Sequence, residues 1–258
     1  MKYLEKHQKT AQRSLEKVAI TVICSVFNGE DYLNKYFLSI EQQKLENFEL
    51  IFVDACSTDR SRSMMARYNP RAGIKKKLIE CDVRLGIYQA WNKAIESSSG
   101  SWIINYNCDD YLFPEALLIL QGVAERDLEH GLVYSPCFIS SSPSHETIQG
   151  YSNWRNANED GSLEAGCCCG PFPLVHRQCY EEHGLFDEKF MYSGDYEMWC
   201  RLHSAGVRML KIETPLGTYF RNPKGLSTRP ENQERRQFED TLARQSLLKK
   251  PWALNISH

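Results

Sequence analysis

Short apolar runs alternate with amphipathic segments between residues 18 and 110, and this alternation limits the possible folds more than any other feature. The strand-like runs are VAITVICS (18–25), FELIFV (48–53), KKKLIEC (75–81) and SWIINYN (101–107). The clearest amphipathic segment, GIYQAWNKAIES, has its apolar residues at helical spacing. Strands that alternate with helices are joined by right-handed crossovers. We therefore predict an α/β fold whose mostly parallel central sheet is flanked by helices.

The pattern changes after residue 110. We expect a helix from Pro114, one strand over 131–139 and a long loop over 140–166. Helices are then predicted near 176–183 and over 195–206, followed by strands over 207–213 and 216–220. The domain boundaries that we predict are a linker or helix over 1–17, a main domain over 18–228 with halves 18–110 and 111–228, and a helical tail over 229–258.

Composition excludes several classes of protein. The formal net charge of the 258 residues is −2, which offers no basic field for nucleic acid. A chain of this length needs no disulfide framework, and several of its ten cysteines lie in apolar runs. We found neither an apolar leader nor a membrane-spanning run. The prediction is a cytoplasmic protein, with peripheral association at a membrane as the alternative.

Polar side chains follow each of the four predicted strands. Ligands bind beyond the carboxyl ends of the strands in open parallel sheets. A turn or a helix cap would explain the polar residues after any one strand. Because the polar residues of all four strands lie at one edge of the sheet, however, they predict a site for a polar ligand and a cation. The site residues predicted at these strand ends, in strand order and with the neighbouring Phe27 and Gly86 included, are Ser25, Phe27, Asn28 and Glu30; Asp54; Asp82, Arg84 and Gly86; and Asn107, Asp109 and Asp110.

The chain resembles the family 2 glycosyltransferases, which have the GT-A fold. The residues that carry the resemblance are VAITVICSVFNGEDYLNKYFLSIEQQ, FELIFVDACSTDRS, GIYQAWNKAIESSSGSWIINYNCDD and GLFDEKFMYSGDYEMWCRL. The resemblance implies inverting transfer of a sugar from a UDP, GDP or dTDP donor to a hydroxyl of a glycan or lipid-linked glycan. It also implies that 18–110 is the nucleotide-binding half and 111–228 the acceptor half, with a smaller acceptor-side region.

The resemblance also assigns roles to the polar residues at the strand ends. Asp109 and Asp110 resemble the DXD signature that holds Mn²⁺ or Mg²⁺, with Asn107 in place of its first acid and Asp110 as the main metal ligand. The other strand-end residues, together with Asn107 and Asp109, would bind the nucleotide sugar. Ala55 replaces the second acid of the commoner motif after strand two, so Asp54 is its only acid. A divalent cation would stabilise the charge on the departing diphosphate, and carboxylates suit these ions.

A carboxylate must also accept the proton of the acceptor hydroxyl. Asp195 corresponds to the base of the family's ED-like motif, while Gly194 stands where many members have glutamate. Glu197 is the second candidate. Arg221 is either a diphosphate partner or part of a surface ion pair. Residues 167–169, three adjacent cysteines, favour a buried segment beside the acceptor side over a zinc site.

Two other classes of function are compatible with parts of this pattern. A nucleotidyltransferase would need a glycine-rich, basic loop after the first strand, whereas SVFNGE has one glycine and no Lys or Arg. A sugar-nucleotide-binding module without turnover would not need Asp195, although Asn107 and Ala55 keep that alternative open. Turnover of a sugar donor with Mn²⁺ separates the enzyme from the module.

Overall fold

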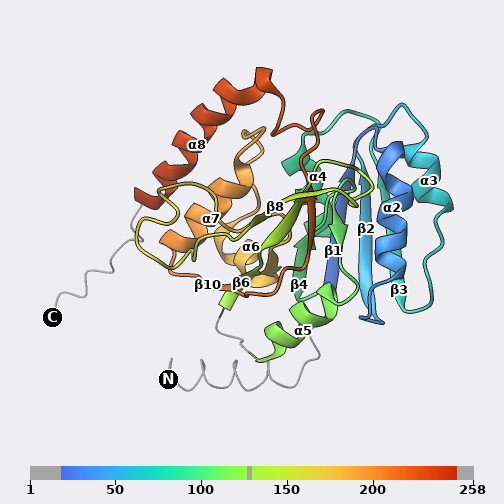
Figure 1. Ribbon diagram of the computed structural model, residues 1–258, viewed down its shortest axis with the longest axis horizontal. Helices are drawn as coiled ribbons and strands as arrows, with labels where there is room; N and C mark the ends of the chain where they lie inside the picture. The colour runs from blue at the N-terminus through green and yellow to red at the C-terminus, as the bar shows by residue number, and fades with distance from the viewer. Residues whose placement is uncertain (1–18, 127–129, 249–258) are drawn as a thin grey trace.

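A seven-stranded sheet forms the centre of the computed structural model, which describes residues 19–126 and 130–248 (Figure 1). The segments 1–17 and 249–258, predicted as a linker or helix and as part of the tail, lie outside these residues. The strands are β1 (Ile20–Val26), β2 (Phe48–Asp54), β3 (Ile74–Glu80), β4 (Trp102–Asn105), β6 (His130–Tyr134), β9 (Leu174–His176) and β10 (Arg208–Lys211). They lie in the order β10, β6, β9, β4, β1, β2, β3, which confirms the predicted α/β architecture.

The four strands predicted from the first half are β1 to β4, and they run parallel. Strands β1, β2 and β4 are almost entirely buried, as expected for parallel strands covered on both faces. Val26 pairs with Asp54, and Ile23 pairs with Asn105. The carboxyl ends of β1, β2 and β4 therefore reach the same edge of the sheet.

Helices cover both faces of the large sheet (Figure 1). One face is covered by α2 (Glu30–Glu41), α3 (Ser61–Arg67) and α5 (Ala116–Arg126). The other is covered by α4 (Ile87–Ser97), α6 (Arg177–His183) and α7 (Gly194–Ser204). The tail helix α8 (Gln233–Leu248) packs along α7, so it adds a further layer on that side.

Three local predictions for the second half were wrong. The single strand expected over 131–139 is divided at Ser135-Pro136 into β6 and β7 (Cys137–Ser140), which belong to different sheets. Proline has no N–H group for a strand ladder, so a break at this point is physically reasonable. The loop expected over 140–166 contains β8 (Ile148–Ser152), and β9 was not predicted. Strand β9 runs antiparallel to β4 and β6, which makes the large sheet mixed.

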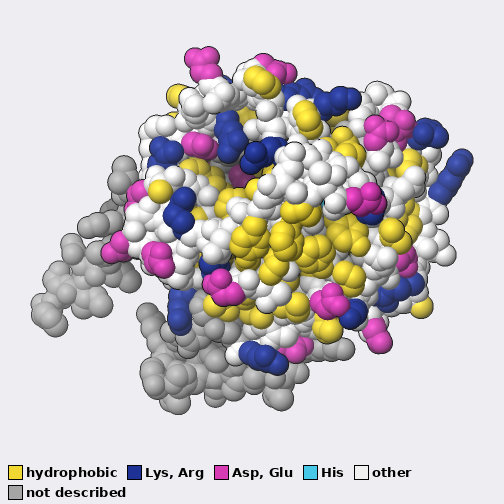
Figure 2. Space-filling view, in the orientation of Figure 1, with side chains coloured by type: hydrophobic (Ala, Val, Ile, Leu, Met, Phe, Trp, Pro, Cys, Tyr) yellow, Lys and Arg dark blue, Asp and Glu magenta, His cyan; other side chains and the backbone are white. Residues whose placement is uncertain are grey.

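A second, four-stranded sheet lies beside the carboxyl end of β4. It contains β5 (Tyr111–Leu112), β11 (Gly217–Phe220), β7 and β8, in that order. In Figure 2, hydrophobic side chains gather over the middle of this face of the molecule, where Figure 1 places β8. Ile148 and Tyr151 of β8 are each 48% exposed. None of the helices in the described part of the chain is long and apolar enough to cross a membrane.

Candidate active site

The turns that follow β1 and β2 are bonded to each other by side chains. Asn28 has a left-handed φ of 51°, and its Oδ1 accepts a hydrogen bond of 2.8 Å from the Thr58 N–H. The carboxylate of Glu30 accepts one of 2.8 Å from the Arg60 N–H. Asn28 and Glu30, both predicted to bind the donor, therefore also hold the first strand end against the second. Ser25 lies just before this junction and is partly exposed.

Asp54 lies at the end of β2 and is 0% exposed. Its Oδ2 accepts a hydrogen bond of 2.7 Å from Nε of Arg62, and its Oδ1 accepts one of 3.2 Å from the Ser57 N–H. Bonding to Asp54 raises the pKa of Arg62. Arg62 also donates to the carbonyl oxygen of Cys81 at 2.8 Å. The acid predicted to bind the nucleotide sugar is thus paired with Arg62, a residue that the sequence analysis did not single out.

A hollow of about 560 Å³ lies beyond the ends of β2 and β3. Arg62 and the predicted residue Asp82 are both part of its lining. Arg84 lies near this hollow, with its guanidinium 3.3 Å from the ring centroid of Phe27, which is 41% exposed. Burial lowers the pKa of Arg84. Gly86 is the residue directly before α4, and its N–H donates to Oε1 of Gln89 at 2.9 Å.

Asp109 and Asp110 follow β4 and differ in exposure. Asp110 is 1% exposed; its Oδ1 accepts a hydrogen bond of 3.0 Å from the Phe220 N–H. Its Oδ2 is buried and has no hydrogen-bond partner among the described residues. Asp109 is partly exposed, and its Oδ2 accepts a bond of 3.1 Å from the Asn222 amide. Asn107 closes the turn, because its carbonyl oxygen accepts from the Asp110 N–H at 3.2 Å.

Burial disfavours the charge of both neighbouring carboxyl groups, and the charge of Asp109 further disfavours that of Asp110. Burial raises the pKa of Asp109, and burial together with the charge of Asp109 raises the pKa of Asp110 well above its ordinary value. Residues 19–126 and 130–248 contain no cluster of three or more His, Cys, Asp or Glu side chains that could hold a metal. The pair nevertheless fits a cation that takes part of its oxygen ligands from substrate and water, as Mg²⁺ commonly does.

Asp195 lies in the first turn of α7, and its side chain contacts α4. Its Oδ1 accepts hydrogen bonds from the Tyr88 hydroxyl at 3.2 Å and from the Tyr196 N–H at 2.8 Å. Among the described residues, Oδ2 accepts no hydrogen bond from another side chain or backbone group. Burial raises the pKa of Asp195. A carboxylate with one anchored oxygen, one unbonded oxygen and a raised pKa is suited to accept a proton.

The tyrosine that holds Asp195 also explains the glycine before it. A Cβ atom at Gly194 would lie only 2.7 Å from Cε2 of Tyr88, whose side chain is 3% exposed. A glutamate, which many family members have at this position according to the resemblance, would therefore displace the Tyr88 ring. Tyr88 belongs to the quoted GIYQAWNK segment, but nothing in the helical periodicity indicated that its hydroxyl reaches α7.

The other two candidates on the acceptor side have different surroundings. Glu197 is 7% exposed, forms an ion pair of 2.9 Å with Arg201 and accepts a hydrogen bond of 3.0 Å from Ser246. The ion pair lies within α7, whereas the hydrogen bond from Ser246 joins α7 to α8. Arg221 is exposed, and its N–H donates to the carbonyl oxygen of Ser140 at 2.9 Å. Glu197 thus has a structural role, whereas the Arg221 side chain faces solvent.

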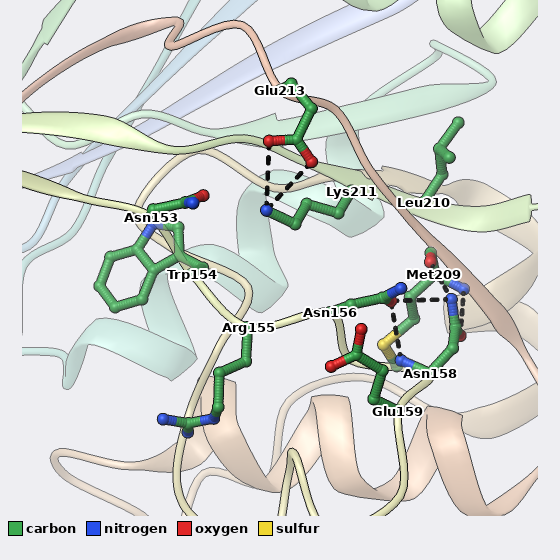
Figure 3. Close-up of a pocket in the computed structure, with 10 residues that line it drawn as sticks. All are labelled: Asn153, Trp154, Arg155, Asn156, Asn158, Glu159, Met209, Leu210, Lys211 and Glu213. Atoms are coloured by element: carbon green, nitrogen blue, oxygen red, sulfur yellow. Dashed lines mark hydrogen bonds and ion pairs between the residues drawn. The ribbon is translucent and has the colours of Figure 1, made fainter.

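Two further features lie around α7 and at the edge of the sheet. Cys168 and Cys169 are 1% and 0% exposed, as expected, whereas Cys167 is partly exposed. Burial and the charge of Asp195 raise the pKa of Cys167. A separate polar pocket of about 440 Å³ lies between residues 153–159 and β10. Figure 3 shows the amide of Asn158 against the backbone of Met209, to which it donates at 2.6 Å. This pocket contains none of the predicted site residues.

Comparison with known sequences gives a consistent family assignment. The family model for glycosyl transferase family 2 matches residues 21–184. An uncharacterised glycosyltransferase of Rickettsia typhi is 24% identical over 197 residues, which are 70% of this chain and 58% of that protein. A glycosyltransferase of PGL/p-HBAD biosynthesis from Mycobacterium bovis is 32% identical over 93 residues, or 36% of each chain. The chain thus spans 58% of the length of the Rickettsia relative.

Solved structures share the fold at low sequence identity. TarS of S. aureus in complex with UDP-GlcNAc matches with a TM-score of 0.70 and 15% identity, over 87% of this chain and 66% of that one. A mannosyltransferase of Pyrobaculum calidifontis in complex with GDP-Man and Mn²⁺ matches with a TM-score of 0.64 and 17% identity, over 86% and 65% of the two chains.

Proposed function

The chain belongs to glycosyl transferase family 2, and on that premise we propose that it transfers a sugar from a nucleotide-diphosphate donor to an acceptor hydroxyl in one inverting displacement. The observation that carries the proposal is the contact between Asp195 of the acceptor half and Tyr88 of the nucleotide-binding half. This contact ties the candidate base to α4, which begins just beyond the carboxyl end of β3. The acceptor that we propose is a glycan or a lipid-linked glycan.

The nucleotide would bind over the ends of β1, β2 and β3. The hollow beside Arg62 and Asp82 has room for a base or ribose, and Phe27 with Arg84 offers a flat surface at its side. Because Asp54 already accepts from Arg62, recognition of the base would involve the Arg62 guanidinium as well as the carboxylate. The bound UDP-GlcNAc and GDP-Man of the two structural neighbours support a UDP- or GDP-sugar as the donor class.

Asp109 and Asp110 would hold a divalent cation, Mn²⁺ or Mg²⁺. Asp110 would be the main ligand through its Oδ2, which has no partner among the described residues, and the partly exposed Asp109 would help to hold the ion. When bound, such an ion stabilises negative charge on the departing diphosphate. Mn²⁺ in the Pyrobaculum neighbour supports this assignment. Arg221, exposed near the same edge, is a further candidate partner for the diphosphate.

Asp195 would act as the general base. Its Oδ2 accepts the proton of the acceptor hydroxyl while the hydroxyl oxygen forms a bond to the anomeric carbon. The bond from that carbon to the phosphate oxygen breaks, and the nucleoside diphosphate leaves with the electron pair. A general base works best when its pKa lies near the operating pH, and burial raises the pKa of Asp195 in that direction. Because Glu197 is already paired with Arg201, Asp195 is the stronger candidate of the two carboxylates in α7.

A thermal-unfolding screen tests the proposed donor class. We expect UDP-N-acetylglucosamine or GDP-mannose to raise the unfolding temperature in the presence of Mn²⁺ and much less with EDTA. Ligand at a hundredfold excess over its dissociation constant stabilises the native state by about 2.7 kcal/mol. The matching nucleoside monophosphates, which lack the diphosphate, are the control. Equal stabilisation with and without Mn²⁺ by every ligand would contradict a metal-anchored diphosphate.

Tyr88→Phe is expected to move the acidic limb of the rate profile to higher pH. Donation by the Tyr88 hydroxyl lowers the pKa of Asp195, so its removal raises that pKa further. A base works only when ionised, and activity is therefore lost at a higher pH as pH falls. The measurement is kcat/KM against pH. Tyr180→Phe is the control, since the Tyr180 hydroxyl has no hydrogen-bond partner among the described residues. Identical profiles for both variants would contradict Asp195 as the base.

A further inference from the structure

One buried carboxylate of α8 accepts hydrogen bonds from three consecutive backbone amides just before α7. Glu239 is 1% exposed. Its oxygens accept from the N–H groups of Met191 at 3.0 Å, Tyr192 at 2.8 Å and Ser193 at 3.2 Å. These three residues precede Gly194, at which α7 begins, and Asp195 comes directly after that glycine.

These hydrogen bonds attach this backbone segment to α8. Ser193 occupies the N-cap position of α7 but makes no side-chain cap bond to the helix. Its hydroxyl instead donates to Oδ1 of Asp240, also in α8, at 2.5 Å. A buried carboxylate is costly unless its oxygens are bonded, and the three amides supply those bonds. The only ion-pair partner of Glu239 among the described residues is Arg235, whose side chain is 54% exposed.

The candidate base is therefore held from two directions. Tyr88 of α4 holds the side chain of Asp195, and Glu239 of α8 holds the backbone two to four residues before it. We propose that Glu239 is a positioning residue for Asp195, and that α8 thereby contributes to the active site. This helix lies beyond residues 21–184, the segment that the family model matches. The inference rests on the proposed role of Asp195 in sugar transfer.

Electrostatics around α8 agree with this placement. Burial raises the pKa of Asp195 and of Tyr219, and the positive charge of Arg236, three residues before Glu239, opposes both rises. Arg236 also donates to the carbonyl oxygen of Ser227 at 3.0 Å. The helix therefore reaches the segment after β11 as well as the start of α7.

Two readouts on Glu239→Gln separate positioning from simple packing. A glutamine keeps the shape but loses the charge, and its NH₂ group cannot accept from the amides. Hydrogen exchange over residues 185–199 is expected to quicken, because the amides of 191–193 would then have a single neutral amide oxygen as acceptor in place of a carboxylate. The turnover number for UDP-N-acetylglucosamine or GDP-mannose hydrolysis is expected to fall roughly 10- to 100-fold, since a misplacement of about 1 Å costs on the order of 10²-fold. The KM for the donor should stay within about twofold.

Glu234→Gln is the matched control, because Glu234 lies on the same helix and is exposed; both readouts should stay at the wild-type level. Should Glu239→Gln not fold, Glu239→Asp keeps the charge with a side chain one methylene shorter, and a smaller loss of turnover at unchanged donor KM is expected. Faster exchange with wild-type turnover would overturn the positioning role. A wild-type chain that turns over no nucleotide sugar would overturn the proposed function, and this inference with it.

Discussion

Asp195→Asn is expected to lower the turnover number by roughly 10²- to 10⁴-fold, which is the usual contribution of a general base. The amide oxygen of asparagine can still accept the hydrogen bonds of Tyr88 and Tyr196, so the start of α7 keeps its geometry. The NH₂ group that replaces Oδ2 cannot accept a proton. The affinity for the donor should change little, because Asp195 is not among the residues proposed to bind the nucleotide. Release of nucleoside diphosphate measures the rate, and calorimetry measures donor binding.

Asp160→Asn provides the control for this variant. It makes the same chemical change on an exposed carboxylate in the 153–166 segment, and turnover should be unaffected. Normal turnover by Asp195→Asn would move the role of base to Glu197. That outcome would also require Glu197 to leave its ion pair with Arg201, which the structure gives at 2.9 Å. A pH-independent, equal loss in both variants would instead indicate a general effect on folding.

Asp110→Asn is expected to stabilise the metal-free protein and to abolish its stabilisation by Mn²⁺ with a nucleotide sugar. Burial and the charge of Asp109 raise the pKa of Asp110 above the ordinary value of 3.8. A carboxyl group whose pKa is raised by folding binds its proton more tightly in the native state. The metal-free native state therefore loses stability as pH rises from the unfolded pKa through the folded one. Asparagine carries no charge, so this loss disappears.

The loss of metal-linked stability is the second part of the same prediction. Wild-type protein with Mn²⁺ and donor at a hundredfold excess should gain about 2.7 kcal/mol, and Asp110→Asn should gain almost none. Asp31→Asn is the matched control, because Asp31 is exposed in the first turn of α2. Urea unfolding of the wild type and both variants, with Mn²⁺ and donor or with EDTA, gives all six free energies of unfolding. Undiminished stabilisation of Asp110→Asn by Mn²⁺ would show that the cation binds elsewhere.

The sequence was most informative where one strong pattern decided the structure. Strands β1, β2 and β4 are parallel and buried on both faces, so they appear as continuous apolar runs. The placement of Asp54 and Asp110 near one edge then follows from strand direction alone. Short or divided strands were not predictable in this way. Strand β9 has three residues, and the break between β6 and β7 depends on which sheet each half joins.

Side-chain partners at the site were the least predictable feature. Arg62 lies eight residues after Asp54, while Tyr88 and Asp195 are 107 residues apart. Glu239 lies 46 residues beyond Ser193. Helical or strand periodicity indicates which side of an element is buried, but not which distant group a polar atom meets. Gly194 was the one local signal, since its departure from the family pattern corresponds to the close approach of Tyr88.

The anomer of the released sugar tests the central claim most directly. NMR spectroscopy can follow hydrolysis of α-linked UDP-N-acetylglucosamine or GDP-mannose by the wild-type chain with Mn²⁺, before the free sugar equilibrates. Water activated by Asp195 in a single displacement should give the β anomer first, and the signal should vanish in Asp195→Asn. Initial formation of the α anomer, or release at the wild-type rate by Asp195→Asn, would contradict an inverting displacement with this base.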